Sequence, residues 1–209
     1  MLGLTASPGS DLESVREICQ NLHIEKVEVR TEKDPDVKPY LQPLKIKWEK
    51  VDFPEEFKKI QKHLQDCRRS KLEEAQKYGY CSRADLMKRE LLGLQGELQR
   101  KISSGDRDFE VLRSISLVAE ALKVDHALEL LETQGIKQLQ EYLRKIQTQS
   151  LTSKVKAVKN LVQDMNFKAA TYFTNQLISQ EVKHPKLEKL TEIIKENLDG
   201  DSKIMILLN

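Results

Sequence analysis

The sequence predicts a mainly α protein, an antiparallel helical bundle placed between short pieces of α/β structure. The 209 residues are 33% charged and 5% aromatic, with eight Gly and six Pro. This profile is typical of long helices and argues against a turn-rich β-sandwich or barrel. Hydrophobic residues recur at the helical period from residue 54, whereas strand-like alternation is confined to the flanks. These observations divide the chain into 1–43, a linking strand at 44–53, a helical domain at 54–183 and a final segment at 184–209.

The first 53 residues read as strand, helix and strand, which is the order of an α/β domain. The apolar run at 1–7 predicts a strand, and Ser10 or Asp11 can cap a helix that continues to about Leu22. Alternating residues predict further strands at 23–30 and 44–51. Between these two, a stretch with three prolines predicts an extended connector.

The helical domain is expected to contain several helices of different apolarity. They are predicted at 54–77, 82–102, 109–134, 136–147, 153–181 with a break near Asn166, and 185–198, before a last strand at 203–208. The third carries the most apolar stripe, Phe109, Leu112, Ile115, Ala119, Leu122, His126 and Leu130. That stripe predicts that this helix is the central one of the bundle.

Charge is distributed unevenly, although the formal net charge is only +2. Residues 54–103 carry a net charge of +4 and residues 135–170 of +5, while 104–134 carry −4. Two basic blocks around an acidic one could form a surface that attracts phosphates, but charge alone favours ordinary solvated helix faces. The candidate phosphate-binding residues are Lys58, Lys59, Lys62, Arg68, Arg69, Lys71, Arg144, Lys145, Lys154, Lys156 and Lys159. Ser150, Thr152 and Ser153 are expected to add hydroxyl groups at a helix start.

Other functional classes find little support in the residues. Three cysteines cannot all pair, and no run approaches a membrane span, so a reducing cytoplasm without membrane contact is expected. The spacings of Cys19 with His23 and of His63 with Cys67 would suit metal ligands, but both cysteines lie on apolar helix faces. We therefore expect no metal site and no catalytic residue in this chain.

Several strings resemble one family of nucleic-acid motors. Residues 4–9 (LTASPG) resemble motif III of superfamily 2 helicases, and residues 34–40 (DPDVKPY) resemble a connector of archaeal Hef. Residues 126–135 (HALELLETQG) resemble a helix of the inserted Hef domain, and 184–186 with 202–206 resemble the start of its second RecA-like domain. The chain is thus similar to the helical insert domain, with flanking RecA-like stubs, of an archaeal Hef-like or Fanconi anaemia M-group-like helicase.

The resemblance implies a fragment of an ATP-dependent DNA repair helicase that acts at replication forks. Its insert would bind branched or duplex DNA through backbone phosphates, and Thr5 and Ser7 would be the hydroxyls that couple hydrolysis to strand movement. ATP, Mg²⁺ and the remaining RecA-like domains would belong to the parent protein. This chain has no GxxxxGK[ST] or DExH string, so we expect no enzymatic activity and no cofactor of its own. A protein-docking module and an insert for double-stranded RNA, as in RIG-like sensors, are the alternatives.

Overall fold

The computed structural model describes residues 4–5, 9, 11–41, 45–180, 182–198 and 205–206. The chain divides into two compact units, residues 1–49 and residues 50–209, which are treated separately here. Within the described residues, no helix combines the length and the apolarity needed to cross a membrane. The predicted terminal strands at 1–7 and 203–208 lie largely outside the described residues, as does Ser7.

The first unit contains one α-helix and one short 3₁₀-helix, α1 (Leu12–Asn21) and η1 (Lys38–Tyr40). Asp11 caps α1 as predicted, because its carboxylate accepts hydrogen bonds from the backbone N–H groups of Glu13 and Ser14. Residues 23–30 and the described part of 44–51 form no strand, so these two predictions were wrong. Alternation gives a segment a strand-like face, but a strand also needs a neighbour for its backbone hydrogen bonds. No such neighbour lies among the described residues.

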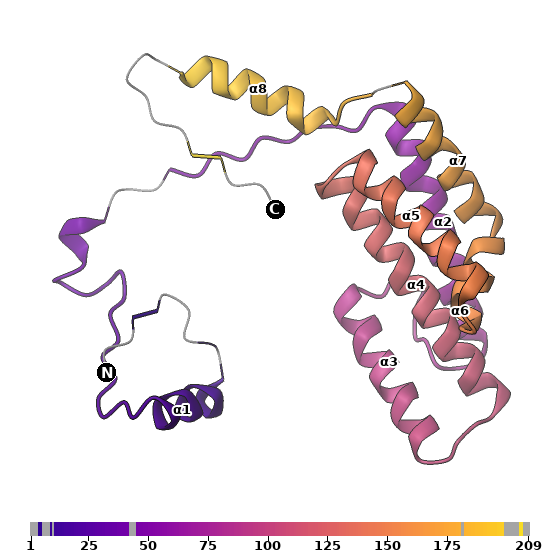
Figure 1. Ribbon diagram of the computed structural model, residues 1–209, viewed down its shortest axis with the longest axis horizontal. Helices are drawn as coiled ribbons and strands as arrows, with labels where there is room; N and C mark the ends of the chain where they lie inside the picture. Colours follow the sequence, from indigo (N-terminus) through magenta and orange to yellow (C-terminus); the bar gives the residue numbers. More distant parts are fainter. Residues whose placement is uncertain are drawn as a thin grey trace. The chain divides into compact units, whose positions relative to one another are not determined.

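The second unit is the predicted helical bundle (Figure 1). Its helices are α2 (Glu55–Lys77), α3 (Lys88–Ser103), α4 (Phe109–Thr133), α5 (Ile136–Thr152), α6 (Lys156–Gln163) and α7 (Met165–Ser179). Helix α8 (Pro185–Asn197) follows the bundle and has no buried residue. The apolar stripe of α2 is buried as its spacing indicates, with Phe57, Ile60, Leu64, Cys67 and Leu72 fully inaccessible. The mainly α fold class and the helical bundle are therefore confirmed.

Helix α4 is central, as its apolar character predicts, because it packs against α2, α3, α5 and α6. The buried residues differ from the predicted stripe, since Phe109 and His126 are exposed whereas Val118 and Val124 are inaccessible. A helix with neighbours on several sides buries more than one face, so a single stripe describes it poorly.

Two helix boundaries differ from those that the sequence predicts. The second bundle helix begins at Lys88 instead of Ser82, because the Glu90 carboxylate accepts the Met87 backbone N–H at 2.7 Å and so caps that end. Helix α5 continues to Thr152, five residues beyond its predicted end. The predicted break near Asn166 is present, at Asp164.

The segments that lead into and out of the bundle meet at one place, which we call the junction. The His184 ring packs edge-on against Phe53, at a centroid distance of 5.9 Å, and against Phe57 at 5.7 Å. Its Nε2 lies 3.2 Å from the Leu131 carbonyl oxygen at the end of α4. Its Nδ1 accepts the Lys186 backbone N–H at 3.2 Å, so Nε2 carries the proton that bonds Leu131.

The junction predicts a pH-dependent stability. Burial lowers the pKa of His184 in the folded protein, and this effect is larger than the opposite effect of the hydrogen bond with the Leu131 carbonyl. The positive charge of Lys186 lowers the pKa further. Because the unfolded chain binds this proton more readily, stability should be complete above about pH 6.5 and decrease as the pH falls below it. Urea unfolding at pH 7.5 and 5.5 should show a larger loss in the wild type than in His184→Gln. Equal losses in both proteins would contradict this assignment.

Candidate nucleic-acid interface

Two of the predicted phosphate-binding cations of α2 are used inside the bundle instead. The Arg68 side chain is 16% exposed, and its Nε lies 2.7 Å from Asp125 Oδ1 on α4. The Lys71 side chain is 11% exposed, and its Nζ lies 2.6 Å from Asp164 Oδ2. Both side chains would have to leave a partly buried carboxylate to reach a phosphate, so we do not include Arg68 and Lys71 in the candidate surface. Helical spacing places them near the exposed cations, but it does not reveal their acidic partners on other helices.

Lys71 belongs to a buried ionic cluster that ties α2, α4 and the α6–α7 boundary together. The Lys71 ammonium also lies 3.5 Å from Glu120 Oε2, and Glu120 is completely inaccessible to solvent. Burial raises the pKa of Glu120 despite the attraction of Lys71. Burial opposes the ionisation of Asp164 too, but the Lys71 ammonium outweighs it and the pKa of Asp164 is lowered. The same Asp164 carboxylate caps α7 by accepting the Asn166 backbone N–H at 2.9 Å.

The remaining cations of α2 are exposed, but two of them have acidic neighbours. Lys58 Nζ lies 2.9 Å from Glu55 Oε1, and Arg69 Nε lies 2.8 Å from Glu73 Oε1. Lys59 and Lys62 are exposed as well. A phosphate that approached this face would also meet the two paired carboxylates.

A second group of cations lies on α5, α6 and the connection between them. We call it the α5–α6 basic surface and define it as Arg144, Lys145, Lys154, Lys156 and Lys159. All five are exposed, and none forms an ion pair with another described residue. The sequence from 142 to 163 contains these five cations and no acidic residue. Asp164, which follows, is neutralised by Lys71.

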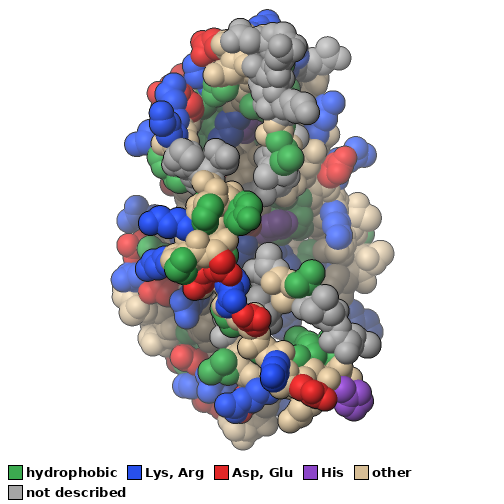
Figure 2. Space-filling view, turned by 90° about the vertical axis from the view of Figure 1, so that its left-hand side faces the viewer, with side chains coloured by type: hydrophobic (Ala, Val, Ile, Leu, Met, Phe, Trp, Pro, Cys, Tyr) green, Lys and Arg blue, Asp and Glu red, His purple; other side chains and the backbone are tan. Residues whose placement is uncertain are grey.

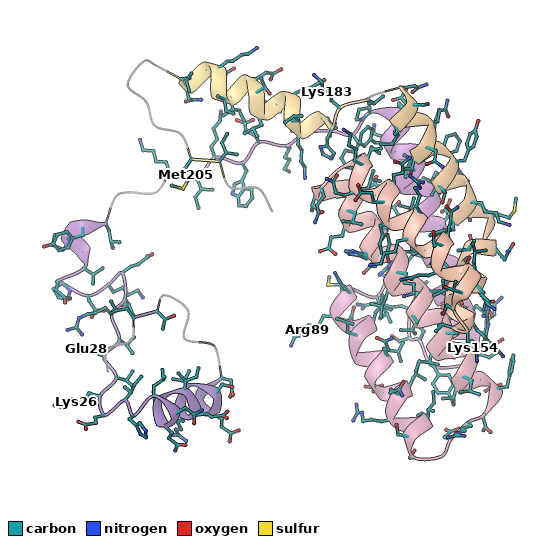
Figure 3. The ribbon with its side chains drawn as sticks, in the orientation of Figure 1. Lys26, Glu28, Arg89, Lys154, Lys183 and Met205 are labelled. Carbon is teal, nitrogen blue, oxygen red and sulfur yellow. The ribbon has the colours of Figure 1, made fainter. Side chains whose placement is uncertain are left out.

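The two lysines of α6, Lys156 and Lys159, face solvent because the opposite face of the helix is buried. Ala157, Val158 and Leu161 are buried, and the Asn160 side chain donates to Glu120 Oε1 of α4 at 3.3 Å. Lys156 and Lys159 therefore lie on the opposite, solvent-facing side of the helix. Lys154 lies on the α5–α6 connection itself (Figure 3).

The hydroxyl groups near this surface are placed differently from the prediction. Ser150 and Thr152 belong to the last turn of α5 and do not start a helix. The Ser150 hydroxyl donates to the Gln147 carbonyl at 2.6 Å, and the Ser153 hydroxyl accepts the Val155 backbone N–H at 3.0 Å. These contacts follow from the longer α5, and the basic side chains around the connection remain exposed.

The remaining candidate groups do not form a site among the described residues. Thr5 is exposed, and its proposed partner Ser7 lies outside the described range. His63 Nδ1 lies 3.1 Å from Asn166 Oδ1, while Cys67 is buried with a raised pKa that is caused first by burial. No group of three or more His, Cys, Asp or Glu side chains within the described residues is arranged to hold a metal ion.

Comparison with known proteins identifies the bundle. A family model described as "Putative ATP-dependent RNA helicase, helical bundle" matches residues 56–184. The chain belongs to this family. It is similar to the crystal structure of the Pyrococcus furiosus Hef helicase domain, with a TM-score of 0.66 and 37% identity, over 93% of this chain and 40% of that one. The resemblance to Hef-like superfamily 2 helicases is therefore confirmed.

Relatives of this helicase family extend well beyond the matched region. The chain is 40% identical over 209 residues to the "Putative ATP-dependent RNA helicase MJ1505" of Methanocaldococcus jannaschii. This match covers 99% of this chain and 25% of the relative. It is 24% identical over 222 residues to the ATP-dependent DNA helicase fml1 of Schizosaccharomyces pombe, covering 99% and 26%. The chain thus spans about a quarter of the length of these relatives.

Proposed function

We propose that the helical bundle binds branched DNA through its backbone phosphates, with the α5–α6 basic surface as the principal contact. The observation that carries this proposal is the set of five exposed cations without an acidic partner in a 22-residue stretch, 142–163, that lacks acidic residues. Phosphate contacts of this kind supply affinity without reading base sequence. The bundle would act without catalysis, within a parent helicase that supplies the motor domains.

The contrast with other faces supports this choice of surface. Figure 2 shows Lys and Arg interspersed with Asp and Glu among the side chains that face the viewer. Within the bundle, α2 has this mixed character, because Lys58 and Arg69 each lie beside a glutamate. A polyanion is attracted most where opposite charges are absent. We therefore place Lys58, Lys59, Lys62 and Arg69 at most at the edge of the contact.

ATP and Mg²⁺ are proposed only for the parent protein. The described residues do not fit a nucleotide with its metal, because the sequence has no phosphate-binding loop and the described acidic side chains form no metal-binding group. Motif III, with Thr5 and Ser7, would act in that larger protein, together with RecA-like domains that flank the bundle near 1–43 and 184–209. We also propose a cytoplasmic location, because three cysteines that cannot all pair are typical of a reducing compartment.

DNA is preferred to RNA because the relatives include a named DNA helicase, although the family description names an RNA helicase. Fluorescence anisotropy should be measured with forked DNA, a four-way junction, plain duplex DNA, single-stranded DNA and duplex RNA, each at 50 and 200 mM salt. We expect the two branched DNAs to bind most tightly. Affinity should fall by about 10²–10³-fold between the two salt concentrations if four to six phosphates are contacted.

Three results would contradict the proposal. Equal affinity for all five nucleic acids would remove the preference for branches, and tighter binding to duplex RNA would favour the RNA alternative. Weak binding that does not change with salt would remove phosphate recognition altogether, and the bundle would then be examined as a protein-docking module.

A further inference from the structure

We propose that the α5–α6 connection is a wedge that inserts at the branch point of forked DNA, with Leu151 as its apolar tip. This inference rests on the proposed function and adds to it the element that would distinguish a branch from a continuous duplex. Leu151 is 84% exposed at the end of α5, and Val155 is 55% exposed just before α6 begins. Lys154 lies between them and Lys156 directly follows.

Leu151 does not contribute to the core of the bundle. The buried residues of α5 are Ile136, Leu139, Leu143 and Ile146, which lie along one face of the helix. Leu151 follows this stripe but remains in solvent, and a single exposed leucine is common on protein surfaces. Its position inside a surface of unpaired cations is the informative feature.

The surroundings of Leu151 define the chemistry of its partner. The partner has to present an apolar face at the centre and negative charges around it, because no acidic residue lies between 142 and 163. A base pair flanked by two phosphate backbones has this composition. An apolar side chain can press against such a base pair, and lysines beside it can bind the flanking phosphates.

The energetics favour a branch point over continuous duplex. Inserting an apolar side chain into an intact duplex requires neighbouring base pairs to unstack. The terminal base pair at a fork already lacks a stacked neighbour on one side, so Leu151 can insert there and unstack that pair at a lower cost than within a continuous duplex. The wedge would therefore add affinity for forks and little for plain duplex.

The wedge also lies well away from the junction. Gly135, which precedes α5, is close to the His184 ring, where an added Cβ would lie 3.4 Å from it. Helix α5 has 17 residues and therefore extends for about 25 Å before it reaches the connection. Figure 3 labels Lys154 at this far end of α5.

The test replaces the apolar character of the connection and leaves its charge unchanged. The double variant Leu151→Ser with Val155→Thr should fold, because both side chains are exposed, and circular dichroism would check this. Leu151→Met is the matched control, since it keeps an apolar tip. Binding is measured for plain duplex and for a fork that carries 2-aminopurine in its branch-point base pair.

We expect the wild type and Leu151→Met to bind the fork at least about tenfold more tightly than duplex and to increase 2-aminopurine fluorescence. The double variant should keep its duplex affinity within about twofold, lose the fork preference and give no fluorescence increase. If it retains both the preference and the increase, the wedge is wrong while the proposed function stands. If the wild type itself binds no DNA, the proposed function fails and the wedge fails with it.

Discussion

Replacing Lys154, Lys156 and Lys159 together with glutamate should weaken binding to forked DNA by about 10²-fold or more at 0.1 M salt. Each lysine that neutralises a phosphate releases about 0.9 of a counterion from duplex DNA. Loss of three contacts should therefore reduce the slope of log affinity against log salt by about 2.7. The three side chains are exposed and unpaired with other described residues, so folding should be preserved. Anisotropy titrations at several salt concentrations would measure both quantities.

A second triple variant provides the matched control. Lys58→Glu, Lys59→Glu and Lys62→Glu change the net charge by the same amount, but on α2, where Lys58 already has Glu55 as a partner. This variant should lose no more than about tenfold in affinity by the longer-range field alone. Equal losses in the two variants would show that net charge, and not the α5–α6 basic surface, governs binding.

The variant Asp164→Ala should destabilise the bundle by about 3–5 kcal/mol. The change removes the carboxylate 2.6 Å from the buried Lys71 ammonium and leaves that charge next to Glu120 alone. It also removes the cap of α7, where Asp164 accepts two backbone N–H groups. Urea unfolding followed by circular dichroism would measure the loss of unfolding free energy.

Two comparisons separate the contributions of Asp164. Asp164→Asn keeps a side chain that can cap α7, so it should be more stable than Asp164→Ala by about 1 kcal/mol. Adding Lys71→Met to Asp164→Ala should recover part of the loss, because it removes a buried ammonium that has kept only its 3.5 Å contact with Glu120. A loss below 1 kcal/mol in Asp164→Ala would mean that the carboxylate does not pair with Lys71 in solution.

Much of the bundle could be predicted from the sequence because burial there follows the helical period. The α2 stripe from Phe57 to Leu72 is buried as predicted, and Asp11 caps α1 as predicted. The break between α6 and α7 lies at Asp164, two residues from the predicted position. The alternation of residue types at 23–30 did not suffice to predict a strand correctly, since a local pattern does not reveal whether a second strand is present to pair with it. The start of α3 also required a contact that spacing left open, the Glu90 carboxylate on the Met87 N–H.

The exposure of the candidate interface residues was only partly predictable, because it depends on contacts between helices. Lys71 and Lys62 look alike in the sequence of α2, yet Lys71 is paired with Asp164, which lies 93 positions away. The exposed cations at 154–159 could be identified, since the surrounding sequence lacks any acidic partner. Leu151 was not singled out from the sequence, because the predicted helix ends at residue 147; α5 in fact continues to Thr152 and leaves the Leu151 side chain 84% exposed.

The junction at Phe53 and His184 has a consequence for how such a bundle can be accommodated within a larger protein. About 130 residues lie between two positions whose rings are 5.9 Å apart. A flexible insertion of this length would impose a loop-closure entropy on its host, which grows with the logarithm of the number of residues. Here the folded bundle holds its own two ends close together, so the loop-closure entropy that it imposes on the flanking chain is that of a short connection.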